Sequence, residues 1–208
     1  YHFFTLYANA GNIIAHEMTT PTNPLDKYIL AELNMLTDIV RAALTEYKPD
    51  VAVKEFVRFL DILNNWYIRR GRARFWDEEQ AAFDTLYTVL TRFCRVLAPF
   101  APFVSEYIYT NLTGAESVHL TSFPETVATD KKIVDDMRRV QMIVSVGKQL
   151  REQYKLRNRL PLNSLTVAGV NMSEYADIIQ DELNVKSVVF NESFGDIADS
   201  FVYLITPK

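Results

Sequence analysis

Hydrophobic residues recur every three or four positions through most of the chain up to residue 154, which is the spacing of amphipathic helices. Proline marks several breaks in this pattern. It fits the first turn of a helix, because that turn needs no donor from its backbone nitrogen. The pattern predicts helices over residues 1–17, 23–47, 50–76, 83–97, 104–112 and 130–154.

The rest of the chain follows a different pattern. Short runs of β-branched and aromatic residues predict strands at 165–168, 187–190 and 201–205, with a short helix over residues 173–183. Residues 117–124, between two predicted helices, are expected to be extended. We therefore expect a mainly α protein. A helical bundle, residues 1–156, would precede a small and incomplete α+β unit, residues 157–208.

The most informative stretch is residues 65–76, called the arginine segment below. It contains both tryptophans of the chain, four arginines and no acidic residue. Guanidinium groups can bind phosphate oxygens in pairs, and an indole ring offers a flat face on which a base can stack. This composition indicates a contact with nucleic acid. The alternative is a solvated arginine face with tryptophans packed against neighbouring helices.

Projected at about 100° per residue, the helix that carries this segment has two sides. The apolar side, which should face a core, contains Leu60, Leu63, Asn64, Tyr67, Gly71 and Phe75. The opposite side, basic and aromatic, contains Arg58, Asn65, Arg69, Arg72 and Trp76.

Three residues of the arginine segment fall between these two sides. Arg70 and Arg74 lie near the apolar edge, where they would either join the outer face or pair with acids and carbonyls of the bundle. Trp66 is also lateral, and we expect it to pack against neighbouring helices.

The charge of the chain is uneven. The net charge is −4, which argues against unspecific nucleic-acid binding, and we expect no DNA partner. The four arginines of the arginine segment give it +4, and residues 148–159, with five bases and one acid, also carry +4. Two basic patches on an acidic body suit a selective contact with phosphate groups.

Composition excludes several classes of protein. With 49% hydrophobic residues and six glycines, the chain can form a sizeable core. It has no apolar run of membrane-spanning length and no secretion signal, so we expect no membrane partner. The single Cys94 rules out an intrachain disulfide and a cysteine-cluster zinc site and suits the cytoplasm. Because the helical pattern is already under way at Tyr1, we expect a piece of a longer protein.

Motifs for catalysis are missing from the sequence. It contains no glycine-rich phosphate loop, no paired histidines at zinc-binding spacing and no nucleophile elbow. Paired acids such as Asp135-Asp136 fall at helix starts or on polar faces, where the helix dipole and solubility explain them. We expect no catalytic residue, no metal ligand and no cofactor within these residues.

Several stretches together resemble the class I aminoacyl-tRNA synthetases, the isoleucyl enzymes most closely. The arginine segment and residues 155–162 are the most specific to the isoleucyl type. The run Leu-Ala-Pro-Phe at residues 97–100 is less specific, since the valyl and leucyl enzymes share it. Further similar stretches are residues 23–30, 117–120 and 182–185.

The resemblance implies a helical anticodon-binding domain followed by the start of a C-terminal junction region. It also implies that the intact enzyme joins isoleucine to its tRNA with ATP and magnesium. The signature sequences His-Ile-Gly-His and Lys-Met-Ser-Lys-Ser, the editing insertion and the zinc-binding cysteines of that enzyme are absent from this chain. The implied partners are the anticodon stem-loop of isoleucine tRNA and the catalytic and C-terminal domains of the same chain.

Combining the composition with the resemblance assigns roles to particular residues. Arg58, Arg69 and Arg72 would contact phosphates, Asn65 would bind a sugar or base, and Trp76 would stack on an unpaired base. Asn9 and Tyr7 on the first helix are weaker candidates by analogy with related synthetases. Basic residues of the later patch, which would guide the tRNA backbone or dock another domain, are Lys155, Arg157 and Arg159.

Two other interpretations stay open from the sequence. A helical protein-interaction module could use the same arginines to bind an acidic partner. The anticodon-binding domain of a valyl enzyme would have the same architecture. An RNA-binding domain should show a steep salt dependence and a preference among loop sequences, which a protein-interaction module need not show.

Overall fold

The structure, a computed structural model, describes residues 1–125, 127, 130–169, 171–191 and 203–206. The backbone falls into two compact units, Tyr1–Lys131 and Lys132–Lys208. Helices dominate the first unit and the strands lie in the second, so the predicted mainly α fold with a small α+β part is confirmed. The predicted boundary lay at residue 156, whereas the structure groups the long helix before it with the strands.

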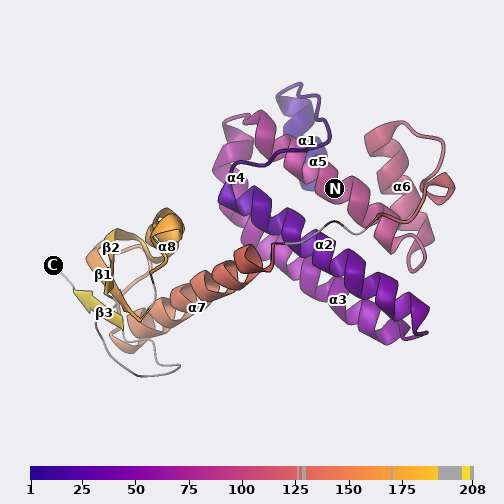
Figure 1. The fold of residues 1–208 in the computed structure, drawn as a ribbon. Helices are drawn as coiled ribbons and strands as arrows, with labels where there is room; N and C mark the ends of the chain where they lie inside the picture. Colours follow the sequence, from indigo (N-terminus) through magenta and orange to yellow (C-terminus); the bar gives the residue numbers. More distant parts are fainter. Residues whose placement is uncertain (126, 128–129, 170, 192–202, 207–208) are drawn as a thin grey trace. The chain divides into compact units, whose positions relative to one another are not determined.

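The first unit is built from helices, of which α1 and α2 are joined by the longer non-helical segment 11–23 (Figure 1). Helices α2 and α3 form a hairpin, and α5 packs against both α2 and α6. The α-helices of this unit are α1 (His2–Ala10), α2 (Pro24–Thr45), α3 (Pro49–Asp61), α4 (Arg69–Trp76), α5 (Gln80–Leu97) and α6 (Pro102–Thr113). A π-helix η1 (Ile62–Ile68) joins α3 to α4, and a 3₁₀ turn η2 (Val118–Leu120) follows α6.

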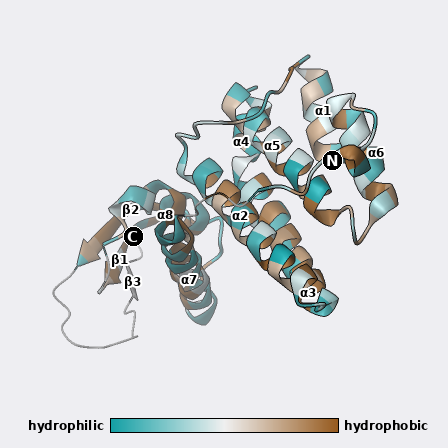
Figure 2. Ribbon diagram, turned by 45° about the vertical axis from the view of Figure 1, so that its right-hand side comes forward, coloured by the Kyte–Doolittle hydropathy of each residue, from teal (hydrophilic) through white to brown (hydrophobic). Residues whose placement is uncertain are grey.

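Local sequence explains the start of α2 and the position of the core. The Asn23 side chain accepts a hydrogen bond from the Leu25 backbone at 2.9 Å, and Pro24 occupies the first helical position. Polar and apolar residues alternate around α2 and α3 (Figure 2). Buried aromatic rings join the helices, for example Phe59 of α3 stacked on Phe93 of α5 with centroids 5.4 Å apart.

Two predicted elements differ in the structure. The first helix ends at Ala10 rather than residue 17, because Asn12 takes a left-handed conformation with φ of 50° that stops helical hydrogen bonding. Within the predicted extended run 117–124, η2 replaces an extended backbone. Ser117 Oγ caps the His119 nitrogen, and the Glu106 carboxylate accepts from the Val118 nitrogen at 2.8 Å.

The predicted continuous α-helix over residues 50–76 is interrupted by η1. In this segment the backbone N–H groups bond five residues back instead of four, as from Arg69 to the Asn64 carbonyl. A projection at 100° per residue therefore misplaces some positions. Asn64 and Leu60 were assigned to the core side, and both are exposed. Leu63 and Phe75 are buried as predicted.

The second unit combines one long helix with a small sheet. Strand β1 lies between β2, to which it is parallel, and β3, to which it is antiparallel. The parallel pair is joined through α8, the usual connection for parallel strands. The elements are α7 (Lys131–Gln153), β1 (Leu162–Ala168), η3 (Ser173–Tyr175), α8 (Ala176–Leu183), β2 (Val185–Asn191) and β3 (Tyr203–Thr206). Residues 201 and 202 of the third predicted strand lie outside the described residues.

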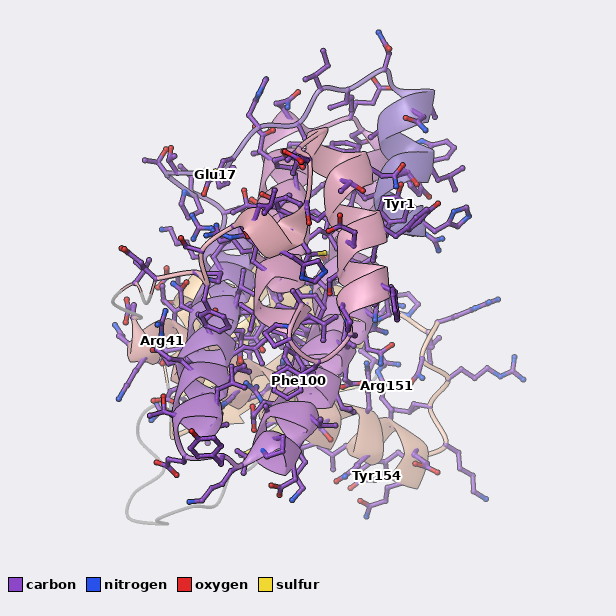
Figure 3. All side chains as sticks on the ribbon, turned by 90° about the vertical axis from the view of Figure 1, so that its right-hand side faces the viewer. Tyr1, Glu17, Arg41, Phe100, Arg151 and Tyr154 are labelled. Atoms are coloured by element: carbon purple, nitrogen blue, oxygen red, sulfur yellow. The ribbon has the colours of Figure 1, made fainter. Side chains whose placement is uncertain are left out.

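Arg151 of α7 is a buried polar hub of this unit (Figure 3). Only 1% of the residue is exposed. Its guanidinium donates to the carbonyl oxygens of four residues, and burial lowers its pKa. The acceptors, which lie in the loop after α7 and at the end of α8, are Arg157, Leu160, Leu183 and Asn184. Arg151 thus fixes the loop that carries the basic residues at 155–159.

Candidate nucleic-acid interface

A row of polar side chains follows the outer side of η1 and α4. Asn65 Nδ2 donates to Asp61 Oδ1 at 2.6 Å, and Arg69 Nε donates to the Asn65 carbonyl oxygen at 2.9 Å. Arg72 continues the row and is exposed. The structure therefore brings Asn65, Arg69 and Arg72 together on one solvent-facing surface, as predicted.

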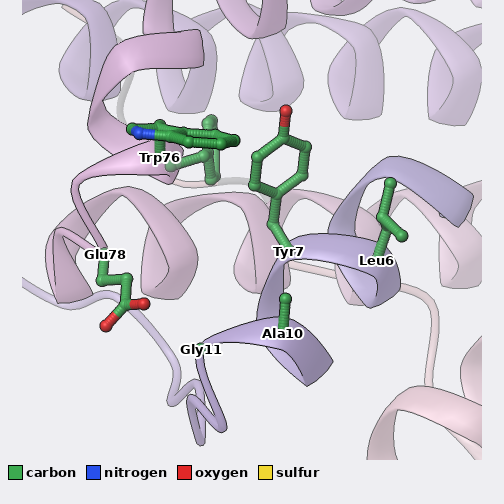
Figure 4. A pocket seen from close by; sticks show the side chains of 7 residues that line it. Leu6, Tyr7, Ala10, Gly11, Trp76 and Glu78 are labelled. Carbon is green, nitrogen blue, oxygen red and sulfur yellow. The ribbon is translucent and has the colours of Figure 1, made fainter.

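Trp76 ends this row and is 74% exposed. Its indole lies close to the Tyr7 ring of α1 (Figure 4). A cavity of about 330 Å³ opens here and is called the Trp76 slot. Residues from α1, from α4 and from the turn after α4 line it: Leu6, Tyr7, Ala10, Gly11, Phe75, Trp76 and Glu78. Three aromatic rings, those of Tyr7, Phe75 and Trp76, and little polar surface make this a site for a flat, partly apolar group.

A second, shallower hollow of about 500 Å³ shares Tyr7 and Trp76 with the slot. It is bordered in addition by Arg72, Ala73 and Asp77. The exposed indole is thus reachable from two hollows, one of which includes an arginine. A ligand that combines a flat ring with an anionic group would match this arrangement.

Arg74 lies on the inner side of α4 and holds the bundle together. Its guanidinium donates to both carboxylate oxygens of Asp26 on α2, at 2.8 and 2.7 Å, and also to Glu79. Tyr67 Oη donates to Asp26 at 2.8 Å. Burial alone would lower the pKa of Arg74, but the bonds to Asp26 and Glu79 raise it well above its usual range. For Arg74, the predicted pairing with acids of the bundle is confirmed.

Arg58 has a similar structural position on α3. Its Nη1 donates to Glu32 of α2 at 2.8 Å and its Nε to Glu55 at 2.7 Å. Glu32 is fully buried, so Arg58 neutralises a charge that could not otherwise be accommodated inside the bundle. Burial opposes the charged form, yet the bonds to Glu55 and Glu32 raise the pKa of Arg58. The predicted phosphate contact would have to compete with these two carboxylates.

The two remaining lateral residues of the arginine segment contact each other. The Arg70 guanidinium carbon lies 5.2 Å from the centre of the Trp66 ring, a cation–π distance. Trp66 is buried, as the sequence predicted. Arg70 is half-buried and lies beside the outer row rather than in it.

The other predicted contacts are exposed. Asn9 lies on α1 but does not line the Trp76 slot, whereas Tyr7 of the same helix does. The later basic patch belongs to the second unit, where Lys155, Arg157 and Arg159 are all exposed in the loop that Arg151 fixes. Lys148, which contributes to the same patch, pairs with Glu182 at 2.6 Å.

Sequence reasoning missed four residues of the slot. Leu6, Ala10, Gly11 and Glu78 come from two separate segments, and no spacing rule connects them. Glu78 gave no signal, since a left-handed residue just past a helix end is usually predicted from a glycine and here the residue is a glutamate. Its backbone φ is 56°, in the left-handed region.

Metal and membrane sites are not indicated in the described part of the chain. Over those residues, no three histidine, cysteine or carboxylate side chains gather at ligand distance. None of the described helices combines the length and apolar character needed to span a bilayer.

Comparison with known proteins bears on this arrangement. Residues 26–167 match a protein family described as the anticodon-binding domain of tRNA ligase. The match covers the whole outer row and most of the helices that support it. The chain belongs to this family. As an anticodon-binding domain, it has the mainly helical architecture that the sequence predicted, and the isoleucyl resemblance is confirmed by individual relatives.

Three relatives show the extent of the similarity. The chain is 44% identical to an isoleucine–tRNA ligase of Leifsonia xyli subsp. xyli, over 92% of this chain and 18% of the relative. It is 43% identical to the isoleucine–tRNA ligase of Chlamydia pneumoniae, over 97% of this chain and 20% of the relative. To the isoleucine–tRNA ligase of Corynebacterium efficiens it is 42% identical, over 100% of this chain and 20% of the relative. The chain thus spans about a fifth of the length of the relatives that it matches.

Proposed function

We propose that this anticodon-binding domain binds the anticodon stem-loop of an isoleucine tRNA, as part of an isoleucine–tRNA ligase. The parent enzyme would use ATP and magnesium for the ligation and would act in the cytoplasm, through catalytic and C-terminal domains beyond this chain. Identities of 42–44% to enzymes named isoleucine–tRNA ligase favour the isoleucyl over the valyl alternative.

The observation that carries the proposal is the exposed Trp76 indole at the end of a row containing Arg69 and Arg72. Single-stranded RNA loops are recognised by stacking unpaired bases on aromatic rings while cations hold the backbone. Trp76 would stack on a base of the loop, and Arg69 and Arg72 would contact its phosphates. Asn65 would bind a sugar or base next to them.

The inner arginines would have a supporting role. Arg58 and Arg74 are engaged with carboxylates of the bundle, so we propose that they hold the outer row in place rather than bind RNA directly. Arg70 would contribute to the local positive potential. Lys155, Arg157 and Arg159 could guide the tRNA backbone or dock another domain, and Asn9 could contact the loop from α1. These roles stay predictions.

Titration with RNA hairpins tests the proposal. The 208-residue chain would be mixed with an isoleucine anticodon stem-loop and with a hairpin of the same stem and a scrambled loop, at several salt concentrations. We expect the first hairpin to bind more tightly. Trp76→Ala should remove this preference, since stacking contributes about 1–3 kcal/mol per base. Arg72→Ala should reduce the salt slope by about 0.7–0.9 for one lost phosphate contact.

A matched substitution keeps the result interpretable. Arg138→Ala removes a similarly exposed arginine from α7, where Arg138 pairs with Asp135, and should leave the loop preference unchanged. Equal binding of both hairpins at every salt concentration would show that the domain does not read the loop. A protein-interaction module would give that result.

A further inference from the structure

Glu78 places a carboxylate in the wall of the Trp76 slot, which is otherwise formed by aromatic and aliphatic groups. In the described part of the chain, no hydrogen bond or ion pair engages this carboxylate. The adjacent Glu79 differs, since it pairs with Arg74 at 2.8 Å. The slot therefore offers two stacking surfaces and one pair of uncommitted acceptor oxygens (Figure 4).

The backbone of Glu78 adds a second observation. Its φ of 56° lies in the left-handed region, which costs a residue with a side chain conformational energy that glycine avoids. A strained residue that glycine would relieve is a reason to ask what its side chain does. Here the side chain reaches the slot.

Gly11, which lies next to this carboxylate, leaves room for it (Figure 4). A Cβ at position 11 would lie 3.1 Å from the Glu78 carboxyl carbon and 3.2 Å from Oε1. Gly11 has an ordinary φ of −87°, so its conformation does not require glycine. The absence of a side chain is instead explained by the close approach of Glu78 together with Ile13, whose Cδ1 would also lie 3.1 Å from such a Cβ.

We propose that the Trp76 slot selects guanine, with the Glu78 carboxylate accepting hydrogen bonds from the N1–H and 2-amino groups of the base. This inference rests on the proposed function, since it assigns a base to the loop-binding surface. An ionised carboxylate only accepts hydrogen bonds, and its two oxygens match two adjacent donors. Guanine is the standard base that presents such a pair on its Watson–Crick edge.

The other bases present a less favourable edge to a carboxylate. Adenine and cytosine each place a ring-nitrogen acceptor beside their amino group, and uracil flanks its single N–H with two carbonyls. Burying an acceptor against an acceptor leaves both unpaired, which is how hydrogen-bonding sites reject near-isosteric ligands. The slot should therefore discriminate by the base edge and not only by stacking.

A cationic ligand is the competing occupant, because aromatic rings and a carboxylate can also hold an ammonium group. The positive charge around the slot favours a neutral base over a cationic ligand. Arg72 borders the hollow that shares Tyr7 and Trp76 with the slot, and Arg69 lies one turn earlier in the outer row. Both repel a cation and attract the phosphates that accompany a base.

Inosine gives a direct test, since it is guanosine without the 2-amino group. Hairpins with a loop guanine would be compared with copies in which inosine replaces one guanine at a time, using the whole chain. We expect one position at which inosine weakens binding by about 5- to 150-fold, the range for a specific base contact. In Glu78→Gln the loss at that position should fall below about twofold, because the paired acceptors are gone.

Two further variants separate recognition from folding. Glu116→Gln removes the same charge from an exposed site after α6 and should keep the full inosine effect. Glu78→Gly should raise the unfolding midpoint, because it relieves the left-handed strain, and should still abolish the inosine effect. A side chain with a merely structural role would not combine a gain in stability with a loss of selectivity.

The possible failures are distinguishable. If the hairpins show a loop preference but inosine equals guanosine at every position, the guanine assignment is overturned and the loop-binding function stands. If no hairpin binds, the guanine assignment and the loop-binding function are both overturned. Binding of a trimethyllysine peptide that depends on Glu78, with RNA binding unchanged in Glu78→Gln, would assign the slot to a cation instead.

Discussion

Arg74 and Asp26 form a two-bonded ion pair across 48 positions of the sequence, with guanidinium–carboxylate distances of 2.8 and 2.7 Å. Asp26 is 1% exposed and the Arg74 side chain 14%. The pair joins α4 to α2, and so attaches the outer row of the arginine segment to the hairpin formed by α2 and α3. The position of the outer row therefore depends on a buried charge pair on the inner side of α4.

Removing Arg74 should therefore destabilise the helical unit. Arg74→Ala leaves the Asp26 carboxylate buried without its counter-ion, and breaking such pairs costs about 3–5 kcal/mol. Urea unfolding followed by the fluorescence of buried Trp66 would measure the change. Arg72→Ala, in the exposed row of the same helix, should change stability by no more than about 0.5 kcal/mol. Equal effects of the two substitutions would contradict the assignment of inner and outer arginines.

Lowering the pH should weaken the ion pair that Arg74 also forms with Glu79. The bond from Arg74, only partly opposed by burial, lowers the pKa of Glu79 below its ordinary value. A group with a lowered folded-state pKa adds stability above its unfolded pKa, and this stability is lost as the pH falls through the folded value. Glu79→Gln should cost about 0.2–1 kcal/mol at pH 7, since the pair is partly exposed.

The pH dependence distinguishes this electrostatic effect from altered packing. Unfolding free energies of the wild-type chain and Glu79→Gln should converge as the pH is lowered below about 4. A difference that persists unchanged at pH 3 would mean that the carboxylate charge is not responsible.

Two helical glycines should respond in opposite directions to alanine. A Cβ at Gly147 of α7 would lie 2.5 Å from Leu183 Cδ1, and Leu183 is buried. Overpacking of this kind costs about 1–3 kcal/mol. At Gly71 of α4 the nearest atom would be Phe75 Cε2 at an ordinary 3.4 Å. Gly71→Ala should therefore stabilise the helix by up to about 1 kcal/mol.

Amide hydrogen exchange would assign each effect to its unit. Faster exchange in α7 and α8 is expected for Gly147→Ala, and slower exchange in α4 for Gly71→Ala. Adding Leu183→Ala to Gly147→Ala should cost less than Leu183→Ala alone, because the two changes compensate in volume. Additive costs would rule out the proposed clash.

The reactivity of the Cys94 thiol reports on the folding of the helical unit and requires no substitution. It is the single cysteine, it is buried, and burial raises the pKa of its thiol to about 12. A thiol reagent should therefore react orders of magnitude more slowly with the native chain at pH 8 than with the chain in urea. Stability should also fall as the pH rises above about 9, where the unfolded thiol ionises and the native one does not. Rapid native-state labelling would contradict this burial.

The sequence predicts much of this fold and part of the site. Helical periodicity and the Asn23-Pro24 start located α2, and the outer positions of Arg72 and Trp76 followed from angular spacing alone. The partners of Arg58 and Arg74 could not be predicted, because Glu32 and Asp26 lie on another helix and tertiary packing brings them close. Local patterns do not contain that information.

The slot escaped prediction for a related reason. Its walls come from α1 and from the end of α4 and the following turn, and Gly11 and Glu78, for example, are 67 positions apart in the sequence. Analogy with related synthetases singled out Tyr7 on the first helix but could not identify its neighbours in the slot. The left-handed backbone of Glu78 is equally invisible in the sequence, since glutamate is a common residue in helices and rarely adopts that conformation.

The π-helical segment η1 (Ile62–Ile68) is a place where the helix running from α3 to α4 can change its length. A π-helical turn accommodates one additional residue within an otherwise α-helical segment. Deleting one residue here should let the backbone revert to α-helical bonding while α3 and α4 keep their packing. The same deletion within α4 would rotate all following side chains by about 100° and point Trp76 away from Tyr7. Insertions and deletions during divergence of this helix are therefore expected to concentrate in η1.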